Sequence, residues 1–458
     1  MIVGGGAAGS EAAFSVSDGG KTRILLAESM HFGGTCTNHG CVPTKALVRA
    51  AKLLHETRVA AAFGVQGGEG EIVWRRAIGR AFQVRDHMLR FGATPFRESG
   101  VEVRFPARAV VTGEHRVRIE GPDGAGEEVE AGTVLIAAGL EAAVPPVPGL
   151  RESGYLDNES VLELPELPNR LAVIGSGPIG SEFAQVFSRF GVQVTVIEVA
   201  DRMLPPEEPE AGAALLEAFE AEGIEVRTGV KMTGVEAAPN GARRIYFESA
   251  ASIEADQILV AAGRSLDGAS LGLDAAGIEW TPRGVKTDAT LRTTADWAWA
   301  AGDVVGGALF THVASEMGQV AARNALRSVR GESADEEIDL RVVPRVTFTD
   351  PEVASVGLTE KQAREAGHDV RIGFARVADA EKAEIDGQRI GHVKVVADAA
   401  GMLLGCQVMA ETAGDMIHEA AVMIAGGVPV RVAARMMHAY PTLSELMRSA
   451  FSEAAGAS

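Results

Sequence analysis

Short apolar runs that end in glycine recur along the chain and predict a parallel α/β fold. Residues 2–3 form the first run, and the glycine turn and alanine-rich segment that follow indicate a strand, a turn and a helix. Residues 171–174 form a second run, again followed by a glycine turn and by a helix that continues through Arg189. Each helix leads to another apolar strand, at 23–28 and at 192–198. The pattern therefore predicts two βαβ units in one chain.

The two glycine turns have the spacing of dinucleotide-binding fingerprints. Glycines in such turns let the backbone approach a pyrophosphate at a helix N-terminus. An acid ends the next strand of each unit, Glu28 nineteen residues after the last glycine of the first turn and Glu198 eighteen residues after that of the second. Such an acid accepts hydrogen bonds from ribose hydroxyls. The glycines are Gly4, Gly6 and Gly9 in the first turn, and Gly175, Gly177 and Gly180 in the second.

Two fingerprints suggest two bound dinucleotides, a flavin and a nicotinamide cofactor, with electron transfer between them. A structural duplication that binds one nucleotide is the alternative. Glu198 bears on the choice of nicotinamide, because a carboxylate there accepts a hydrogen bond from a ribose 2′-hydroxyl and repels a 2′-phosphate. We therefore expect NADH rather than NADPH, although Arg202, four residues further on, can weaken this preference.

Between the two βαβ units, the pattern of apolar residues is first helical and then alternating. Residues 46–97 have the helical period with a break at 64–70, whereas residues 101–129 alternate apolar and polar positions between turn signals. The alternation predicts a small antiparallel meander. Further buried strands are expected at 133–139, 258–263 and 297–304. Asp303 follows the last strand, at the end where α/β sheets bind ligands, with a solvated acid as the alternative interpretation.

A proline-rich linker is predicted at 144–149, between the first two units. A third unit, without a nucleotide motif, begins near Arg341. Cys406 lies in one of its strands and is predicted to be an inert, packed thiol. The predicted elements of this unit are strands at 344–348, 391–396 and 402–408, and helices at 414–425 and 430–437.

Composition and charge narrow the class of partner. The 458 residues are enough for two to four domains. A formal net charge of −19 argues against nucleic acid or an anionic membrane surface, because neither attracts an acidic protein. No apolar run reaches the roughly 20 residues needed to span a bilayer, and the N-terminus lacks the basic segment of a signal peptide. We expect a cytoplasmic protein with no membrane span.

Two of the three cysteines, Cys36 and Cys41, are separated by four residues. In a regular helix the Cα atoms of such a pair lie roughly 8–9 Å apart, beyond the about 4.4–6.8 Å of a disulfide. If the sulfurs pair, the backbone must leave the helix, and Gly40 is best able to allow this. Two unrelated buried thiols are the alternative. Three cysteines are too few for a secreted scaffold, so a bond between these two is expected to be catalytic.

Taken together, these features resemble the class I pyridine nucleotide-disulfide oxidoreductases, the family of dihydrolipoamide dehydrogenase, glutathione reductase and mercuric reductase. The likeness covers essentially the whole chain, and its most specific part is the stretch from Gly33 to Lys45, Gly-Gly-Thr-Cys-Thr-Asn-His-Gly-Cys-Val-Pro-Thr-Lys. The resemblance implies two Rossmann-like domains, for FAD and NAD(P), and a C-terminal α+β dimerisation domain. The expected division is FAD-binding residues 1–149 and 266–338, NAD(P)-binding residues 150–265, and dimerisation residues 339–458.

The resemblance also implies roles for single residues. Cys36 would be the thiol that meets the acceptor, Cys41 the thiolate near the flavin, and Lys45 and Glu182 an ion pair beside the flavin. Hydride electrons would pass from NADH (or NADPH) through FAD to a Cys36–Cys41 disulfide. No resident metal is expected. The implied FAD-site residues are Gly4, Gly6, Gly9, Glu28, Gly34, Thr35, Gly139 and Asp303. The implied NAD-site residues are Gly175, Gly177, Gly180, Glu198 and Gly263.

One position departs from the disulfide-reducing members of that family. Their acid–base catalyst is a histidine that precedes a Pro-Thr pair and acts with a glutamate across the interface of a homodimer. Here Tyr440 occupies the histidine position, and Glu445 stands where the glutamate does. An unperturbed tyrosine has a pKa near 10, against about 6.5 for histidine, so it is a poor proton shuttle at neutral pH. His438 could replace the histidine only after a backbone rearrangement.

Tyrosine at this position resembles mercuric reductases and soluble transhydrogenases. Mercury enzymes typically also carry a C-terminal cysteine pair, and this chain has no cysteine after Cys406. We therefore expect a homodimeric flavoenzyme in which Tyr440 and Glu445 of one chain complete the other's site, with a soft metal ion or a quinone-type molecule as acceptor. Dihydrolipoamide dehydrogenase acting on lipoamide is the first rival, and a redox sensor without turnover is the second.

Overall fold

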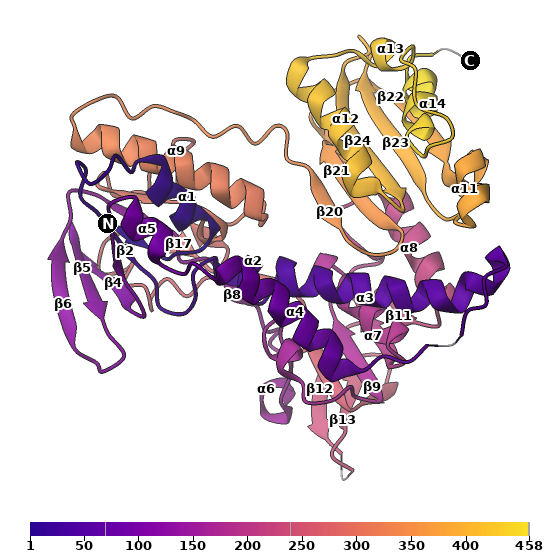
Figure 1. The fold of residues 1–458 in the computed structure, drawn as a ribbon, viewed down its shortest axis with the longest axis horizontal. Helices are drawn as coiled ribbons and strands as arrows, with labels where there is room; N and C mark the ends of the chain where they lie inside the picture. Colours follow the sequence, from indigo (N-terminus) through magenta and orange to yellow (C-terminus); the bar gives the residue numbers. More distant parts are fainter. Residues whose placement is uncertain (69, 239, 457–458) are drawn as a thin grey trace. The chain divides into compact units, whose positions relative to one another are not determined.

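The computed structural model describes residues 1–68, 70–238 and 240–456, and the chain folds into two units built from interleaved segments (Figure 1). The first unit comprises residues 1–46, 78–143 and 263–340. The second comprises residues 47–77, 144–262 and 341–458. Among the described helices, none is long and apolar enough to cross a membrane.

A five-stranded parallel sheet forms the centre of the first unit. Its strand order is β19-β7-β1-β2-β3. The strands are β1 (Ile2–Val3), β2 (Ile24–Ala27), β3 (Val101–Arg104), β7 (Val134–Ile136) and β19 (Ala298–Ala300). The strands expected at the N-terminus, at 133–139 and at 297–304 are therefore confirmed.

The meander expected at 101–129 is smaller than predicted. Its first segment, β3, instead pairs in parallel with β2, where Val101 lies opposite Ile24. The alternating pattern marked this segment as a half-buried strand but carried no information about its partner. The antiparallel meander itself contains β4 (Arg108–Gly113), β5 (Arg116–Glu120) and β6 (Gly126–Glu130).

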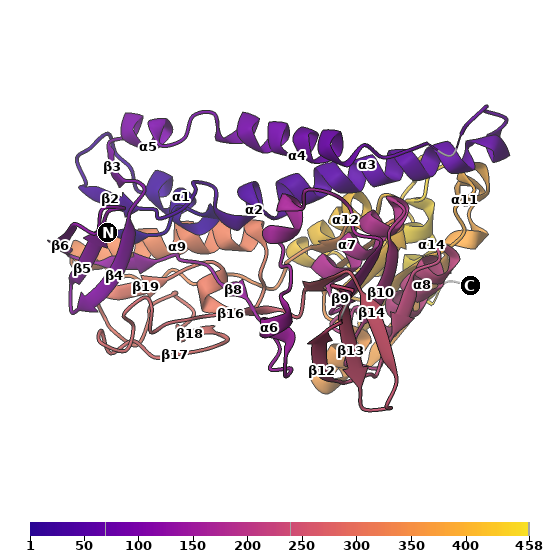
Figure 2. The same ribbon diagram turned by 90° about the horizontal axis from the view of Figure 1, so that it is seen from below.

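Helices α1 (Ala7–Ser15) and α9 (Thr311–Val329) lie side by side against this sheet (Figures 1 and 2). Their backbones are very close, because a Cβ at Gly318 would come within 2.1 Å of the Ala8 carbonyl oxygen. The meander packs on the sheet through the apolar side chains of Val111 and Val117, which join one buried cluster with Ile136. The sheet is thus covered by helices and by the meander.

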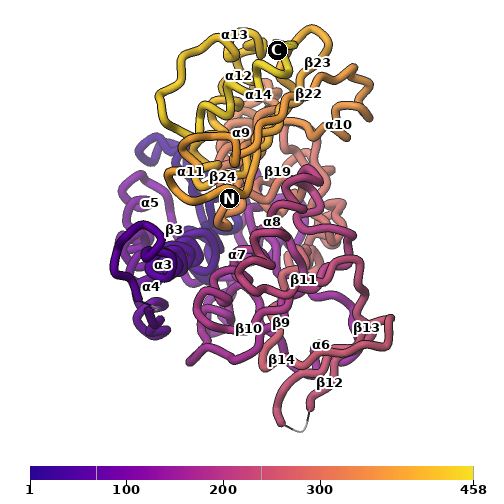
Figure 3. The backbone as a smooth tube through the Cα atoms, turned by 90° about the vertical axis from the view of Figure 1, so that its right-hand side faces the viewer, coloured from indigo at the N-terminus to yellow at the C-terminus, as the bar shows by residue number. Residues whose placement is uncertain are grey.

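The second unit repeats this plan. A parallel sheet of order β11-β10-β9-β15 packs against the meander β12-β13-β14 through one buried cluster. Helices α7 and α8 follow β9 and β10, and Figure 3 shows them beside the strands of this sheet. The elements are β9 (Arg170–Ile174), α7 (Pro178–Arg189), β10 (Gln193–Ile197), α8 (Pro209–Ala221), β11 (Glu225–Arg227), β12 (Met232–Ala237), β13 (Arg243–Phe247), β14 (Ser252–Ala255) and β15 (Gln257–Val260).

The C-terminal part of this unit is a five-stranded antiparallel sheet with two helices, α12 and α14, packed on it. Cys406 lies in β24 and is only 3% exposed, so the prediction of a packed thiol is confirmed. The elements are β20 (Arg345–Thr347), β21 (Glu352–Gly357), β22 (Val370–Arg376), β23 (His392–Asp398), β24 (Leu403–Ala410), α12 (Ala413–Gly426), α13 (Val430–Ala433) and α14 (Glu445–Ala454).

The helix predicted at 430–437 is too long, because α13 ends at Ala433. Met437 is 95% exposed within the chain, so the apolar run has no buried face that would extend the helix. The remaining elements are α2 (Gly34–Asn38), α3 (Cys41–Val59), η1 (Ala60–Phe63), α4 (Trp74–Leu89), α5 (Thr94–Glu98), β8 (Glu141–Ala142), α6 (Leu150–Ser153), η2 (Ser160–Glu163), β16 (Arg264–Ser265), β17 (Trp280–Thr281), β18 (Gly284–Val285), η3 (Asp303–Val305), α10 (Glu360–Glu365), η4 (Val377–Asp379) and α11 (Glu381–Asp386).

Candidate active site

The first glycine turn lies at the N-terminus of α1 and has room only for glycine at positions 4 and 9. Gly4 has φ +104°, and a Cβ there would lie 2.4 Å from the Ala137 carbonyl oxygen. A Cβ at Gly9 would lie 1.9 Å from the Gly4 carbonyl oxygen. The Glu28 carboxylate accepts a hydrogen bond from the Gly5 backbone N–H at 2.7 Å and so braces the turn. The exposed N–H groups of a helix start can therefore meet a pyrophosphate here.

The second glycine turn has the same construction at the N-terminus of α7. Gly175 has φ +103°, and a Cβ at Gly180 would lie 2.0 Å from the Gly175 carbonyl oxygen. The Glu198 carboxylate accepts hydrogen bonds from the Ser176 N–H and hydroxyl, both at 2.8 Å, and from the Ala200 N–H at 2.8 Å. A carboxylate has about four acceptor positions, so Glu198 can still accept from a ribose hydroxyl. Both turns fit a dinucleotide.

The cysteine stretch is attached directly to the first glycine turn. The Gly33 N–H donates to the Gly5 carbonyl oxygen at 3.0 Å, and a Cβ at Gly34 would lie 2.8 Å from the Cα of Gly6. The predicted break between the cysteines is present, because α2 ends at Asn38 and α3 begins at Cys41. Thr35 lies in α2, next to Cys36. The stretch thus lies beside the turn that fits the first dinucleotide.

The two thiols of this stretch share one proton unequally. Cys36 and Cys41 are free and lie within hydrogen-bonding reach of each other. The hydrogen bond from Cys36 lowers the pKa of Cys41 to about 6, with further contributions from Thr311 and Lys45 and against a penalty from burial. The same contact and burial raise the pKa of Cys36. At neutral pH Cys41 is therefore a thiolate and Cys36 holds the proton, which makes the pair a nucleophile and electron donor.

Thr311 is a site residue that sequence reasoning missed. Its hydroxyl oxygen lies 3.6 Å from the Cys41 sulfur, although the two residues are 270 positions apart. Thr311 is also the first residue of α9, a helix of 19 residues whose positive N-terminal end stabilises a nearby anion. The only signal in the sequence is a hydroxyl residue at the start of a helical pattern, which does not identify a sulfur partner.

Replacing Thr311 with valine should raise the pKa of Cys41. A hydrogen bond to a charged group contributes about 1.5–3 kcal/mol, and one pKa unit corresponds to about 1.36 kcal/mol, so the expected rise is roughly one to two units. The Cys41 pKa is lowered in the folded protein, so its thiolate forms above about pH 6. Alkylation of reduced protein, mapped at each cysteine by mass spectrometry across pH, measures the midpoint. Thr311→Ser keeps the donor and should retain the low midpoint; an unshifted midpoint in Thr311→Val contradicts the role.

Asp303 lies near the start of helix α1, where the first glycine turn is. It opens the short helix η3 after Gly302, where a Cβ would lie 2.8 Å from the Cβ of Ala8 in α1. Burial raises the pKa of Asp303, with Arg264 acting in the opposite direction. A half-buried carboxyl beside α1 fits a hydroxylated ligand that lies along this helix start. Its predicted contact with the ribityl chain of FAD stays a prediction.

The other predicted cofactor and ion-pair residues are divided between the two units. Gly139 and Gly263 belong to the first unit and have φ +71° and +119° in connections next to β8 and β16. Lys45 belongs to the first unit and Glu182 to the second, so their predicted ion pair stays a prediction. Glu182 is 3% exposed in α7, and its Oε1 accepts a hydrogen bond from the Phe348 N–H at 3.0 Å.

In the segment around Tyr440, the tyrosine ring faces solvent, whereas the ring of His438 is buried. Tyr440 is 69% exposed within the chain, and Glu445 accepts a hydrogen bond from the Thr442 N–H at 3.3 Å at the start of α14. His438 has a side chain only 6% exposed, with Nε2 3.2 Å from Glu419. His438 is thus held inside its own unit, which argues against its replacing a histidine at position 440.

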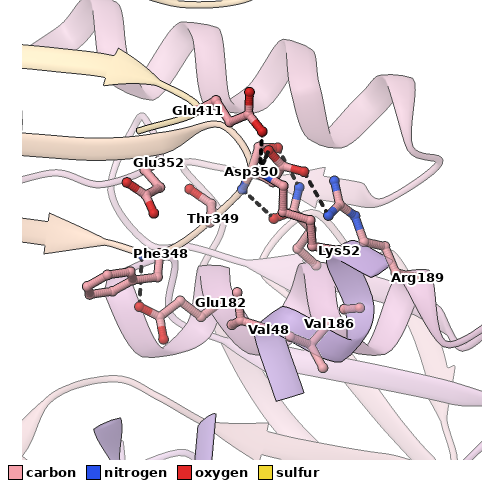
Figure 4. Close-up of a pocket in the computed structure, with 12 residues that line it drawn as sticks. Val48, Lys52, Glu182, Val186, Arg189, Phe348, Thr349, Asp350, Glu352 and Glu411 are labelled. Atoms are coloured by element: carbon pink, nitrogen blue, oxygen red, sulfur yellow. Dashed lines mark hydrogen bonds and ion pairs between the residues drawn. The ribbon is translucent and has the colours of Figure 1, made fainter. Parts of the chain in front are cut away.

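A buried charge network in the second unit was also missed (Figure 4). Arg189, only 4% exposed, contacts Glu222 at 2.7 Å and Asp350 at 3.0 Å. Asp350 also lies 3.6 Å from Lys52, which pairs with Glu411 at 2.8 Å. The network joins α3, α7 and the residues around β20 to β24. Single charged residues in the sequence carry no signal that they will meet.

Among the described residues, no group of three or more histidine, cysteine or acidic side chains could hold a metal ion.

Comparisons with known proteins identify the family of this chain. Residues 1–318 match the family model described as pyridine nucleotide-disulphide oxidoreductase, and residues 343–451 match the dimerisation domain of the same family. The chain is 34% identical over 454 residues to dihydrolipoyl dehydrogenase from Bacillus subtilis, covering 98% of this chain and 97% of that protein. It is 35% identical over 463 residues to mercuric reductase from Bacillus cereus, covering 98% of this chain and 70% of that protein.

Two solved structures have closely similar folds. A Cu(II) complex of the HOCl-induced flavoprotein disulfide reductase RclA from Escherichia coli is 28% identical with a TM-score of 0.84, and the match covers 98% of each chain. LpdA from Mycobacterium tuberculosis is 27% identical with a TM-score of 0.86, again over 98% of each chain. The comparisons confirm the resemblance, the fold class and the two expected cofactors, FAD and NAD(P)H, and the dimerisation domain indicates a homodimer.

Proposed function

Because the chain belongs to the pyridine nucleotide-disulphide oxidoreductase family, we propose that it uses NADH to reduce a soft metal ion, or alternatively a quinone-type acceptor. The observation that carries this proposal is the combination of a thiol–thiolate pair, Cys36 and Cys41, with a tyrosine at position 440. A metal ion needs two electrons or one but no proton, so it does not need the histidine that disulfide substrates require.

FAD and NADH, when bound, supply the hydride chemistry. The residues of the chain bind these cofactors and set the charge of the thiol pair. The glycine turns and the carboxylates of Glu28 and Glu198 would hold the two dinucleotides. The hydrogen bond from Cys36, together with Thr311 at the start of α9, keeps Cys41 anionic, which makes it a donor of electrons and a soft metal ligand. Oxidation of this thiol–thiolate pair to a disulfide releases two electrons and the one proton held by Cys36, which balances the reduction of one Hg(II) to Hg(0) or of two Cu(II) to Cu(I).

The relatives support this acceptor class without deciding it. One is a mercuric reductase, and one solved neighbour was obtained as a Cu(II) complex. The homodimer suggests that Tyr440 and Glu445 of one chain complete the site of the other, with the exposed Tyr440 ring facing the acceptor.

A second candidate is dihydrolipoyl dehydrogenase acting on lipoamide. The match to the Bacillus subtilis enzyme spans 97% of that protein, and Glu445 stands at the glutamate position. Tyr440 opposes this candidate, because removing general acid–base catalysis typically costs roughly 10²–10⁴ in rate. Steady NADH oxidation with any acceptor would exclude the third reading, a redox sensor without turnover.

The test is an anaerobic acceptor panel of Hg(II), Cu(II), a quinone, lipoamide and glutathione disulfide, run with wild type and with Cys36→Ser. We expect Cys36→Ser to lose metal reduction by at least roughly tenfold, because the thiol pair acts as a unit. Cys406→Ser is the matched control, since that thiol is buried in β24 and should not affect the panel. Equal rates of metal reduction by wild type and Cys36→Ser would contradict the proposal of a metal acceptor. Retained quinone reduction in Cys36→Ser would assign the quinone instead.

A further inference from the structure

Two histidines of the first unit contact each other close to the thiol pair. His31 lies in the segment between β2 and α2, and His39 directly follows α2, inside the loop from Cys36 to Cys41. Their ring centroids are 5.6 Å apart, and the rings meet edge to face with an interplanar angle of 63°. The function proposed above gives neither ring a role.

His39 extends from the same face of α2 as Cys36. The His39 N–H donates to the Thr35 carbonyl oxygen at 2.9 Å, so the helical hydrogen-bond pattern of α2 continues to this residue. Side chains three positions apart on a helix are neighbours, with Cβ atoms about 5–6 Å apart. Gly40 packs on the same turn, because a Cβ there would lie 3.3 Å from the Cα of Cys36. The His39 ring is therefore attached next to the Cys36 thiol.

The backbone that carries His31 is also held in place. Glu28 Oε1 accepts hydrogen bonds from the N–H groups of Met30 at 2.6 Å and His31 at 3.0 Å. The His31 carbonyl oxygen accepts the Gly34 N–H at 3.2 Å. His31 is exposed and His39 is half-buried, so a small ion can reach the pair from solvent. Ligands on a fixed backbone lose little conformational freedom on binding.

Two adjacent imidazoles are suitable ligands for a divalent ion such as Cu(II). An ion bound by one nitrogen of each ring at about 2.0–2.1 Å would hold the ring centres roughly 4.5–6.5 Å apart, depending on the angle at the ion. The observed 5.6 Å lies within this range, so the side chains need little movement. An edge-to-face contact that only stabilises this segment is the alternative.

Among the residues that the structure describes, no third histidine, cysteine or acidic side chain joins this pair in a metal-binding group. An ion held by two nitrogens keeps coordination positions open for water and for an incoming sulfur. The third cysteine cannot compete for it, because Cys406 is only 3% exposed. Such a site therefore suits an ion that is captured and then passed on.

We propose that His31 and His39 form a capture site for the metal acceptor, where a Cu(II) ion binds before it passes to Cys36 and Cys41. The proposal rests on the proposed function and narrows its acceptor to an ion that imidazole binds well. The electron balance stays as given above, because the histidines bind the ion and do not exchange electrons with it.

Binding is measured apart from reduction. The FAD-loaded dimer that carries Cys36→Ser and Cys41→Ser is titrated with Cu(II), and binding is followed by calorimetry and by electron paramagnetic resonance. This background removes the thiol ligands and any reduction of the ion by them. We expect one Cu(II) per chain with hyperfine coupling to two imidazole nitrogens. Adding His31→Phe or His39→Phe should weaken this binding by at least roughly tenfold, because loss of a group that only orients a ligand already costs about 10–100-fold.

The phenylalanine variants separate metal binding from ring packing. Phenylalanine keeps an aromatic ring, and with it the edge-to-face contact, but supplies no metal-binding nitrogen. His87→Gln is the matched control, because His87 is an exposed histidine of α4 in the same unit, and this variant should bind Cu(II) as the background does. Unchanged Cu(II) affinity and nitrogen coupling in both phenylalanine variants would overturn the proposal.

A second measurement tests the role of the site in turnover. With both cysteines present, His31→Phe should raise the KM for Cu(II) by at least roughly tenfold and change kcat much less, because saturating Cu(II) still reaches the thiols. A loss confined to His39→Phe, together with slower alkylation of Cys36, would make His39 an acid–base group and overturn the capture site.

The two measurements also distinguish this proposal from the proposed function. Cu(II) binding at the histidine pair without Cu(II) reduction would support the site and contradict the proposed acceptor. Cu(II) reduction with an unchanged KM in both phenylalanine variants would support the proposed acceptor and overturn the site.

Discussion

Replacing Tyr440 with histidine should raise lipoamide turnover by roughly 10²-fold or more, because general acid–base catalysis contributes about 10²–10⁴. The variant supplies an imidazole with an unperturbed pKa near 6.5 in place of a phenol near 10. The position is accessible, since the Tyr440 side chain is 69% exposed, and Glu445 already stands five residues further on. The measurement is kcat/KM for lipoamide as a function of pH, with NADH saturating.

The pH profile separates a gained catalyst from a structural effect. Tyr440→His should acquire a dependence on a group that titrates near neutrality, which the wild type lacks. Tyr440→Gln removes the ring without adding a titratable group and should give no comparable gain. If wild type already turns over lipoamide rapidly, or if Tyr440→His brings no gain, then position 440 does not limit disulfide chemistry and dihydrolipoyl dehydrogenase becomes the better assignment.

Replacing Arg189 with methionine should lower the free energy of unfolding by about 3–5 kcal/mol, as expected when one partner of a buried ion pair is removed. The Arg189 side chain is 4% exposed and lies between the carboxylates of Glu222 and Asp350. Methionine fills much of the same space but removes the cation between the two carboxylates, and Asp350 then keeps only Lys52, at 3.6 Å. Urea titration of the FAD-saturated protein measures the change, and lowering the pH should reduce it because protonation neutralises the carboxylates.

An exposed pair provides the matched control. Arg49 and Glu56 lie 3.4 Å apart with side chains 60% and 47% exposed, and Arg49→Met should cost well under about 1 kcal/mol. The contrast would assign the cost to burial and not to loss of an arginine in general. Equal, small costs in both variants would show that water or a rearranged side chain compensates the buried carboxylates.

The thiol pair and Tyr440 together define what is unusual about this chain. The Cys41 thiolate keeps the electron-donating half of the site intact, since its pKa is lowered to about 6. The departure lies in the proton-transferring half, at Tyr440. We propose that a reductase built this way favours acceptors that take electrons without protons.

Much of the fold could be read from the sequence, because its signals are local. The glycine turns need backbone approaches that a Cβ would block, as the 1.9 Å and 2.0 Å distances from Gly9 and Gly180 show. Apolar runs located the parallel strands, because this signal is also local in the sequence. Pairing was harder, since β3 has the pattern of a meander strand and joins the parallel sheet through β2. The C-terminal helix at 430 was overextended because apolar residues there, such as Met437, are not buried within the chain.

By itself, the sequence determined the two dinucleotide turns, the cysteine pair and the tyrosine at position 440, since each is carried by residue identity and spacing along the chain. Only the tertiary structure decided which groups tune that chemistry. Thr311 reaches the Cys41 sulfur from 270 positions away. The buried charge network around Arg189 is assembled from α3, α7, Asp350 and Glu411. Protonation and ion pairing depend on burial and on neighbours a few ångströms away, and those neighbours are set by folding.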